Sequence, residues 1–446
     1  MQSKSNQITE GPVAGALIKF AVPFLISSLL QALYGAVDLF VVGQYADASA
    51  VSAVAIGSQV MQTITGIILG ISMGGTVLIG HCIGARDHKK AADAVGTMAV
   101  LFLIMAVILT PIMLLCTNGA VSLMQTPVES AANTRTYIFI CSVGIPFIIG
   151  YNAVSGIFRG LGDSKTPTYF IALACIINIA ADFLLAGALH MGAAGAALAT
   201  ILAQAVSFLT ALIYMYKKGF VFEFHKKNMR MNKNCVKSIL KVGFPLALQD
   251  GLVNISFLAI TAIINTMGLV ASAAVGVVEK IICFAMLPPS AFGSAVATMT
   301  AQNMGAGKPK RAFTALKCGI GFSLIFGVIF CTYAQFLPET LTRIFTTDPQ
   351  VITAAGQYLM SYAIDCILVS FVFNMNAYFS GCDKSVISFI HSMIATFAVR
   401  IPVTALLSHH SQGTLYPMGL AAPAASLISL IICAAYFLHL KRHHKI

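Results

Sequence analysis

Apolar segments about as long as a bilayer is thick recur along the whole chain, and they restrict the possible folds more than any other feature. Of the 446 residues, 58% are hydrophobic and only 9% are charged, whereas a soluble domain carries about 25% charged residues. A membrane-spanning helix needs about 20 consecutive apolar residues, and segments of this kind must be helical because lipid cannot satisfy free backbone groups. The sequence therefore predicts an all-α polytopic membrane protein.

Twelve apolar segments of spanning length can be placed along the chain. The eleven cysteines are scattered and mostly lie within these segments, which is typical of small buried apolar residues rather than of disulfides or a metal site. No phosphate-binding loop or hydrolase motif is present, so we expect neither an enzyme nor a bound cofactor. The predicted spans are 16–43, 52–79, 91–116, 134–158, 166–188, 192–216, 238–268, 273–300, 312–336, 354–379, 385–408 and 416–440.

The basic residues gather on one side of the predicted membrane. When alternate loops are assigned to two sides, one side collects all but four of the 27 Lys and Arg residues. The exceptions are Arg135 and Arg343 on the other side, and Lys280 and Arg400 within spans. The positive-inside rule then predicts a multi-pass plasma (inner) membrane protein with both termini in the cytoplasm. The net charge of +12 implies contact with anionic membrane lipids, not with nucleic acid.

The second half of the chain resembles the first. "KFAVPF" at 19–24 matches "KVGFPL" at 241–246, and "IGARDHKKA" at 83–91 matches "MGAGKPKRA" at 304–312. A long basic stretch divides the spans six and six, so the two halves share one orientation and are related by a pseudo-two-fold axis along the membrane normal. Duplicated bundles of this kind are typical of transporters, with ion and substrate sites near the bilayer midplane. We predict an N-terminal lobe at 1–216, a cytoplasmic linker at 217–237 and a C-terminal lobe at 238–446.

An acidic residue within a span costs about 2.5–3.5 kcal/mol even on the most lenient scale, so each one is a functional candidate. Asp182 and Thr200 lie equally far from the turn near Met191, which predicts one depth for both. Asn178 lies one helical turn from Asp182, and Asp38 lies near the outer end of the first span. These oxygen ligands suit Na⁺, and two close carboxylates could instead share a proton. The alternative is that Asp182 only bonds to Asn178 and holds helices together.

The second half carries its own charged residues within spans. Glu279 lies beside Lys280, but neighbours on a helix face different directions, so a structural ion pair or a substrate contact remains open for each. Asp365 either contacts a cationic substrate or pairs with Arg400 or Lys280. Because acids outnumber bases within the spans, a cationic substrate is favoured.

Further polar and aromatic residues are candidates for a substrate cavity, although ordinary packing explains them equally well. Pro23 and Pro245 occupy matching places in the first and seventh spans, where a proline removes a backbone bond and bends the helix. We hypothesise that protonation or ion release at Asp38 changes how the first span bends at Pro23. The candidate cavity residues are Tyr34, Asn152, Gln249, Asn254, Glu279, Asp365 and Asn374.

Several motifs together give a family resemblance over essentially the whole chain. They are "LYGAVDLFVVGQ" in the first span, "FRGLGDSKTPTYF" before the fifth, the two basic loops quoted above, and "VVEKIICFAMLPPSAFGSAV" in the eighth. With these motifs the chain resembles the multidrug and toxic compound extrusion (MATE) family of the MOP flippase superfamily.

The resemblance implies two six-helix lobes and an alternating-access antiporter that exports amphipathic organic cations in exchange for Na⁺ or H⁺. In the DinF-type branch an Asp, an Asn-x-x-x-Asp pair and a Thr form the cation site, and Asp38, Asn178, Asp182 and Thr200 match that pattern. In the NorM-type branch a second-lobe site uses a Glu in the seventh helix and an Asp in the tenth, and this chain has Asp365 in its tenth span but no mid-membrane acid in its seventh. The resemblance therefore favours the first lobe for the ion site, and it suggests a monomer.

Three other functions are alternatives to cation export. A lipid-linked oligosaccharide or lipid flippase of the same superfamily would need a cationic cavity for pyrophosphate, and the acidic balance within the spans argues against it. An intramembrane enzyme lacks a nucleophile and base. A passive channel fits the duplicated lobes and buried acids less well than a carrier does. The sequence does not identify the physiological substrate or the coupling ion.

Overall fold

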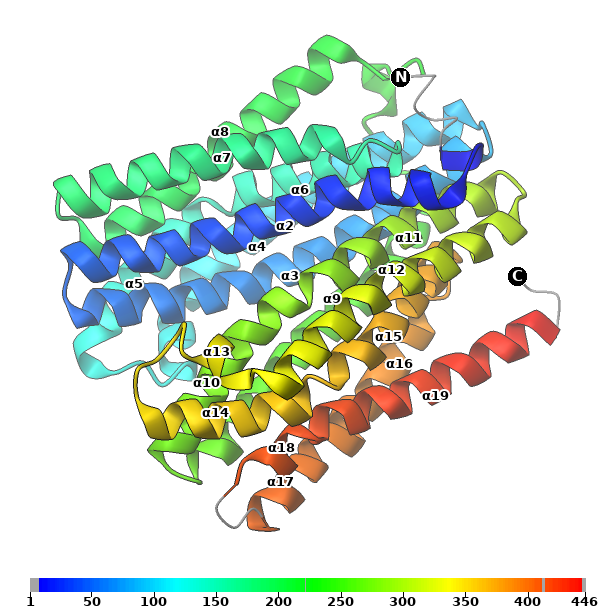
Figure 1. Cartoon of the computed structure of the whole chain (residues 1–446). Helices are drawn as coiled ribbons and strands as arrows, with labels where there is room; N and C mark the ends of the chain where they lie inside the picture. The colour runs from blue at the N-terminus through cyan, green and yellow to red at the C-terminus, as the bar shows by residue number, and fades with distance from the viewer. Residues whose placement is uncertain (1–7, 221, 411–413, 443–446) are drawn as a thin grey trace. The chain divides into compact units, whose positions relative to one another are not determined.

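Long helices packed side by side make up the protein (Figure 1). The computed structural model describes residues 8–220, 222–410 and 414–442. Within these ranges the regular secondary structure consists of helices alone, which confirms the all-α prediction.

The helices account for twelve possible membrane spans. Ten helices, some of them joined end to end, are long and apolar enough to cross a bilayer, and two bent pairs raise the number to twelve among the described residues. The bent pairs are α5 with α6, which meet at 49°, and α14 with α15, which meet at 46°. The predicted number of spans is therefore confirmed, and two of the spans are broken.

The chain forms two compact units. The first contains Ile26–Ala247, and the basic segment expected to link two lobes packs within it. In that segment Asn228 donates a 3.0 Å hydrogen bond to Asp93 on α4. The helices of this unit are α2 (Val13–Tyr45, from Ile26 onward), α3 (Ala48–Gly84), α4 (His88–Leu123), α5 (Val128–Val143), α6 (Ile145–Gly160), α7 (Lys165–Asp182), η1 (Phe183–Ala188), α8 (Gly192–Lys218), η2 (Lys226–Asn228) and the first part of α9 (Lys233–Asn265).

The second unit contains Ile8–Leu25 and the residues from Leu248 onward. The lobe boundaries expected from the sequence stay a prediction. The helices of this unit are the first part of α2, the rest of α9, α10 (Leu269–Ala285), α11 (Leu287–Gly305), α12 (Pro309–Phe336), α13 (Pro338–Thr342), α14 (Pro349–Tyr362), α15 (Asp365–Gly381), α16 (Ser385–Met393), η3 (Ile394–Arg400), α17 (Ile401–His410), α18 (Tyr416–Gly419) and α19 (Ala421–Arg442).

Two helices pass from one unit to the other, and each does so just after a proline. The unit boundary in α2 lies between Leu25 and Ile26, shortly after Pro23, and the boundary in α9 lies shortly after Pro245. Both prolines lie inside helices that continue past them, as the sequence predicts. The boundaries therefore fall where each helix has lost a backbone hydrogen bond.

Glycines allow α3 and the first part of α9 to pack backbone against backbone in the first unit. A Cβ atom added at Gly74 would lie 2.1 Å from the Ile239 carbonyl oxygen, and one added at Gly70 would lie 2.4 Å from the Ala247 nitrogen. Gly243 approaches the backbone of Ile71 in the same way. Small residues four apart let membrane helices approach this closely, which explains why this part of α9 belongs to the first unit.

The start of the described chain is fixed to the second unit by one arginine. The Arg311 side chain donates to the carbonyl oxygens of Ile8 (3.2 Å), Glu10 (2.7 Å) and Gly11 (2.6 Å). Lys308 adds a 3.0 Å bond to the Thr9 carbonyl oxygen. The segment that leads into α2 is therefore attached to the basic beginning of α12.

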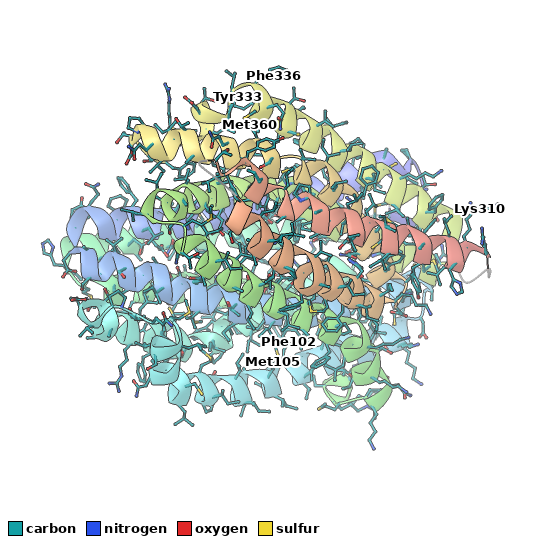
Figure 2. All side chains as sticks on the ribbon, turned by 90° about the horizontal axis from the view of Figure 1, so that it is seen from below. Phe102, Met105, Lys310, Tyr333, Phe336 and Met360 are labelled. Carbon is teal, nitrogen blue, oxygen red and sulfur yellow. The ribbon has the colours of Figure 1, made fainter. Side chains whose placement is uncertain are left out.

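The two ends of α12 differ in chemistry. Figure 2 shows Lys310 at one end and Tyr333 and Phe336 at the other, close to Met360 of α14. Gln335 donates a 2.6 Å hydrogen bond to the Met360 carbonyl oxygen, which joins α12 to α14 at the aromatic end. Aromatic side chains are enriched at membrane interfaces, so this polarity agrees with a helix that crosses the bilayer.

Candidate functional site: a buried acidic cluster in the first unit

Asp38 on α2 and Thr200 on α8 are directly linked. The Thr200 hydroxyl donates a 3.1 Å hydrogen bond to Asp38 Oδ2. The Asp38 side chain is only 5% exposed. Within the first unit α2 also contacts α7, where Ser27 donates a 2.8 Å hydrogen bond to Thr168. α2 therefore lies against both helices that carry the other candidate ligands.

The two candidate residues on α7 complete the group. Asn178 is 1% exposed and Asp182 is fully buried, and both lie close enough to the Asp38 carboxyl group to interact with it. Five polar atoms of the cluster nevertheless make no hydrogen bond of normal geometry to any described residue. They are Asp38 Oδ1, both carboxylate oxygens of Asp182, and Oδ1 and Nδ2 of Asn178. Buried polar atoms are rarely left without partners, so this group has capacity to bind a ligand.

A change of helix type directly follows Asp182. α7 ends at Asp182 and continues as the π-helical segment η1, in which the Leu189 amide donates to the Leu184 carbonyl. π segments disturb the regular hydrogen-bond ladder and are frequent at functional sites. This segment could not be predicted from the sequence, because composition alone does not distinguish π from α turns.

The chemistry of the cluster suits a hard monovalent cation or a proton. It offers two carboxylates, one amide oxygen and one hydroxyl, which are the oxygen ligands that hard cations prefer. Transition-metal sites draw on more nitrogen, sulfur or acidic ligands, and no group of three or more His, Cys, Asp or Glu gathers anywhere in the described chain. The residues present therefore fit Na⁺, and the close pair of carboxylates equally fits one shared proton.

The other candidates of the first unit lie near the cluster or within helix packing. Tyr34 lies one turn before Asp38 and accepts a long 3.5 Å hydrogen bond from Gln204 on α8. Asn152 is 8% exposed, and its side chain bonds to the Ile148 carbonyl of its own helix at 2.8 Å. Tyr34 is thus placed to contact a ligand near Asp38, whereas the Asn152 amide is already engaged.

The candidates of the second unit do not form one cluster. Asn374 is fully buried and donates to Ser323 on α12 at 2.9 Å. Gln249 has a buried Oε1 atom without a hydrogen bond to any described residue, and Asn254 is exposed. Asp365 is 5% exposed and begins α15 directly after the bend, while Glu279 is half-buried on α10.

Arg400 is the residue whose surroundings the sequence did not reveal. It ends the π segment η3, where its guanidinium group lies 4.4 Å from the centroid of the Phe257 ring and donates a 2.9 Å hydrogen bond to the Tyr362 hydroxyl. Its position within a predicted span was a signal, but the aromatic partners come from distant helices.

Comparison with known proteins agrees with the fold and the duplication. The MatE family model matches the chain twice, at residues 23–184 and 245–406. The chain is 27% identical over 425 residues to the probable multidrug resistance protein YoeA of Bacillus subtilis, covering 94% of this chain and 92% of the relative. It is 29% identical over 407 residues to the probable multidrug resistance protein YpnP of the same organism, covering 91% of each.

A solved structure has the same fold. It is described as the outward-facing conformation of a multidrug resistance MATE family transporter of the MOP superfamily, and it matches with a TM-score of 0.92 at 21% identity, covering 99% of this chain and 98% of that chain. The family model and the multidrug resistance relatives thus identify a multi-pass membrane transporter, not an enzyme. The chain belongs to the MATE family. Its assignment to the DinF-type branch stays a prediction.

Proposed function

We propose that this protein is a secondary active antiporter that exports amphipathic organic cations in exchange for Na⁺ or H⁺. Family membership and the multidrug resistance relatives support an efflux role, and they do not favour the lipid flippase alternative. The observation that carries the coupling proposal is the acidic cluster. Asp38, Asn178 and Asp182 are almost fully buried, yet five of their polar atoms lack hydrogen bonds to described residues.

The proposed role of each residue follows from its chemistry. Asp38 and Asp182 bind the coupling ion or proton, the Asn178 amide oxygen adds a neutral ligand, and the Thr200 hydroxyl orients Asp38. Two buried carboxylates without a cation repel each other strongly in a low dielectric. The loaded and empty clusters therefore favour different conformations, and an ion can drive a two-state change only through such differential affinity.

The proposed transporter also has particular substrates, lipid contacts and an orientation in the membrane. Organic cations are the proposed substrates, and anionic lipids are the proposed contacts of the basic loops. The protein would act as a monomer in the plasma membrane with both termini in the cytoplasm, as the positive-inside rule predicts. Pro23 would let α2 bend when the cluster at Asp38 binds or releases the coupling ion or proton. Pro23→Ala should then weaken ion coupling.

The decisive experiment measures efflux of a dye cation in everted vesicles with a Na⁺ or a proton gradient imposed separately. Wild type should respond to one of the gradients, which names the coupling ion. Asp182→Asn keeps the side-chain shape and removes one charge, so this variant should respond to neither gradient. Glu339→Gln is the matched control, because Glu339 pairs with Arg343 at a half-exposed site in the second unit and does not belong to the cluster.

Two results would contradict the proposal. Wild type that moves the dye cation under neither gradient would refute antiport itself. Coupled efflux by Asp182→Asn at the wild-type rate would mean that Asp182 only holds helices together, and the search for the coupling site would then move to Glu279 and Asp365. Surface expression of each variant is measured in parallel, so that loss of protein is not read as loss of coupling.

A further inference from the structure

The buried face of α16 in the second unit is polar along its whole length. Ser385, Ser388 and His391 follow one another at intervals of one helical turn, and each is at most 1% exposed. Val386 and Ile390, on other sides of this helix, are 49% and 44% exposed. Polar side chains are costly within a membrane span, and they commonly mark the paths of ions or protons. The polar face of α16 is therefore a candidate for such a path.

His391 is held between two neighbouring helices. Its Nε2 atom lies 2.5 Å from Asn376 Oδ1 on α15, and its Nδ1 atom lies 3.2 Å from Ser429 Oγ on α19. An amide oxygen only accepts, so Nε2 carries a hydrogen, and Nδ1 of the neutral ring accepts from the Ser429 hydroxyl. If Nδ1 gains a proton, Ser429 Oγ can accept from it instead. The ring can therefore bind and release a proton at Nδ1 without losing either partner.

The imidazole of His391 has neutral neighbours. Its two ring nitrogens are occupied by Asn376 and Ser429, and within the described part of the chain it forms no ion pair. A buried cation without a paired anion is costly, so a proton would pass through this ring and not remain on it. α15 and α19 pack against α16, and η3 continues it. The titratable and charged groups of these three elements are Asp365, Cys366, Tyr378, Arg400, Cys433, Tyr436, His439, Lys441 and Arg442.

Polar residues extend from His391 in both directions. Ser429 lies one turn after Ser426 on α19, and Ser426 lies close enough to the Asp365 carboxyl group to interact with it. Asp365 is 5% exposed, and its Oδ1 atom has no described hydrogen-bond partner. In the other direction the two serines of α16 lead to the loop before this helix, which the positive-inside rule predicts to be cytoplasmic. The buried hydroxyl of one of them, Ser388, also lacks a described partner.

The first unit shows that the fold does not require a histidine at this place. α7 begins two residues after Asp163, and α16 begins two residues after Asp383. Counted from these starts, Ile171 of α7 takes the place of His391, and it is 6% exposed. An apolar side chain therefore satisfies the packing at this position of the repeat, and packing alone does not explain His391.

Histidine is the usual proton shuttle near neutral pH, and a serine hydroxyl donates and accepts at once. We propose that His391 carries protons between the cytoplasmic loop and Asp365, through the serines of α16 and α19. In each passage Nδ1 gains a proton from one side and loses it to the other, so the ring returns to its neutral form and Asp365 gains or loses one proton. This inference rests on the proposed antiport function with H⁺ as the coupling ion.

The test follows protonation of Asp365 in purified protein, without substrate or gradient. After a rapid drop in pH, infrared spectroscopy records the carbonyl band of each newly protonated carboxyl group, and Asp365→Asn identifies the part that belongs to Asp365. His391→Gln keeps a donor and an acceptor for Asn376 and Ser429 but cannot carry a proton. It should slow the appearance of this band about 10-fold or more, because a positioned acid–base group is lost, and it should leave the final size of the band unchanged.

His439→Gln is the matched control. His439 is an exposed histidine near the end of α19 in the same unit, so this variant should keep the wild-type rate. If His391→Gln is poorly folded, Ser429→Ala interrupts the same route beside the ring and should also slow the band. Ser429→Thr keeps the hydroxyl and should stay close to wild type.

Three results would overturn the proposal. They are an unchanged rate in both His391→Gln and Ser429→Ala, a changed final band size at an unchanged rate, which would show a structural role only, and the absence of an Asp365 band in wild type. Failure of the antiport proposal is visible separately, because it appears as efflux in vesicles that responds to neither gradient. The infrared rate does not depend on any gradient.

Discussion

Thr200 on α8 donates a 3.1 Å hydrogen bond to Asp38 on α2, across 162 residues of sequence. This contact joins α8 to α2 at a buried carboxylate. It leaves Asp38 Oδ1 without a partner among the described residues, so the hydroxyl orients the carboxylate while one of its oxygens stays available to an ion.

Removal of the Thr200 hydroxyl should weaken ion coupling. Thr200→Val keeps the side-chain shape and loses a hydrogen bond to a charged group, which contributes about 1.5–3 kcal/mol. The ion concentration that gives half-maximal efflux should therefore rise about 10-fold or more. Thr200→Ser retains the donor and should stay close to wild type. Equal behaviour of the Val and Ser variants would contradict the role assigned to the hydroxyl.

Ion binding at the cluster should be visible as thermal stabilisation. If Na⁺ is the coupling ion, the melting temperature of purified wild type should rise when choline is replaced by Na⁺, since a ligand at 100 times its Kd stabilises by about 2.7 kcal/mol. Asp182→Asn should lose this response. If Na⁺ has no effect, a pH series replaces it, and the stability of wild type should depend on pH more than that of the variant does. A full response in the variant would exclude Asp182 from the site.

The close approach of α3 and α9 should not tolerate a methyl group. A Cβ at Gly74 would overlap the Ile239 carbonyl oxygen, so Gly74→Ala should lower the melting temperature through overpacking that costs about 1–3 kcal/mol. Gly119 in the helix α4 has no atom within 4 Å of its added Cβ. Gly119→Ala should be neutral or slightly stabilising, because alanine is the better helix former. Equal melting temperatures for the two variants would refute the backbone contact.

The hydrogen bonds from Arg311 should protect residues 8–12 from proteolysis. Arg311→Gln removes charge-assisted bonds to the carbonyls of Ile8, Glu10 and Gly11, so limited proteolysis within residues 8–12 should become about 10-fold faster or more. Lys310→Gln is the matched control, since the neighbouring Lys310 is exposed at the end of α12 (Figure 2). Equal cleavage rates in the two variants would mean that the Arg311 hydrogen bonds do not protect this segment.

Most of the fold could be predicted from the sequence, because backbone groups in lipid must form their hydrogen bonds within helices. Hydropathy predicted twelve spans, and the basic loops and matching motifs predicted the repeat. The bends at Gly144 and beside Asp365 were not predicted, because each lies within an apolar stretch long enough to read as one helix. The four residues of the acidic cluster were selected by residue type and depth, and the structure brings them together, while their role in coupling stays a prediction.

The surroundings of Arg400 show where sequence reasoning ends. Its charge within a span was evident, but its partners depend on which faces of α9 and α14 turn toward it. That orientation is set by packing in the second unit and by the π segment η3, which shifts the direction of the side chain relative to a regular α-helix. Neither the packing of these helices nor the position of the π segment can be predicted from residue pattern and composition.

The division of α2 and α9 between the two units has a consequence for biosynthesis. Residues 8–25 are translated before the first unit, yet they pack with residues from Leu248 onward. The first helix must therefore wait in the bilayer, with part of its surface facing lipid, until the whole first unit has been translated. The first unit is itself incomplete until Ala247 has been inserted. Neither half of the chain, if severed within 217–237, would contain all the pieces of its own unit.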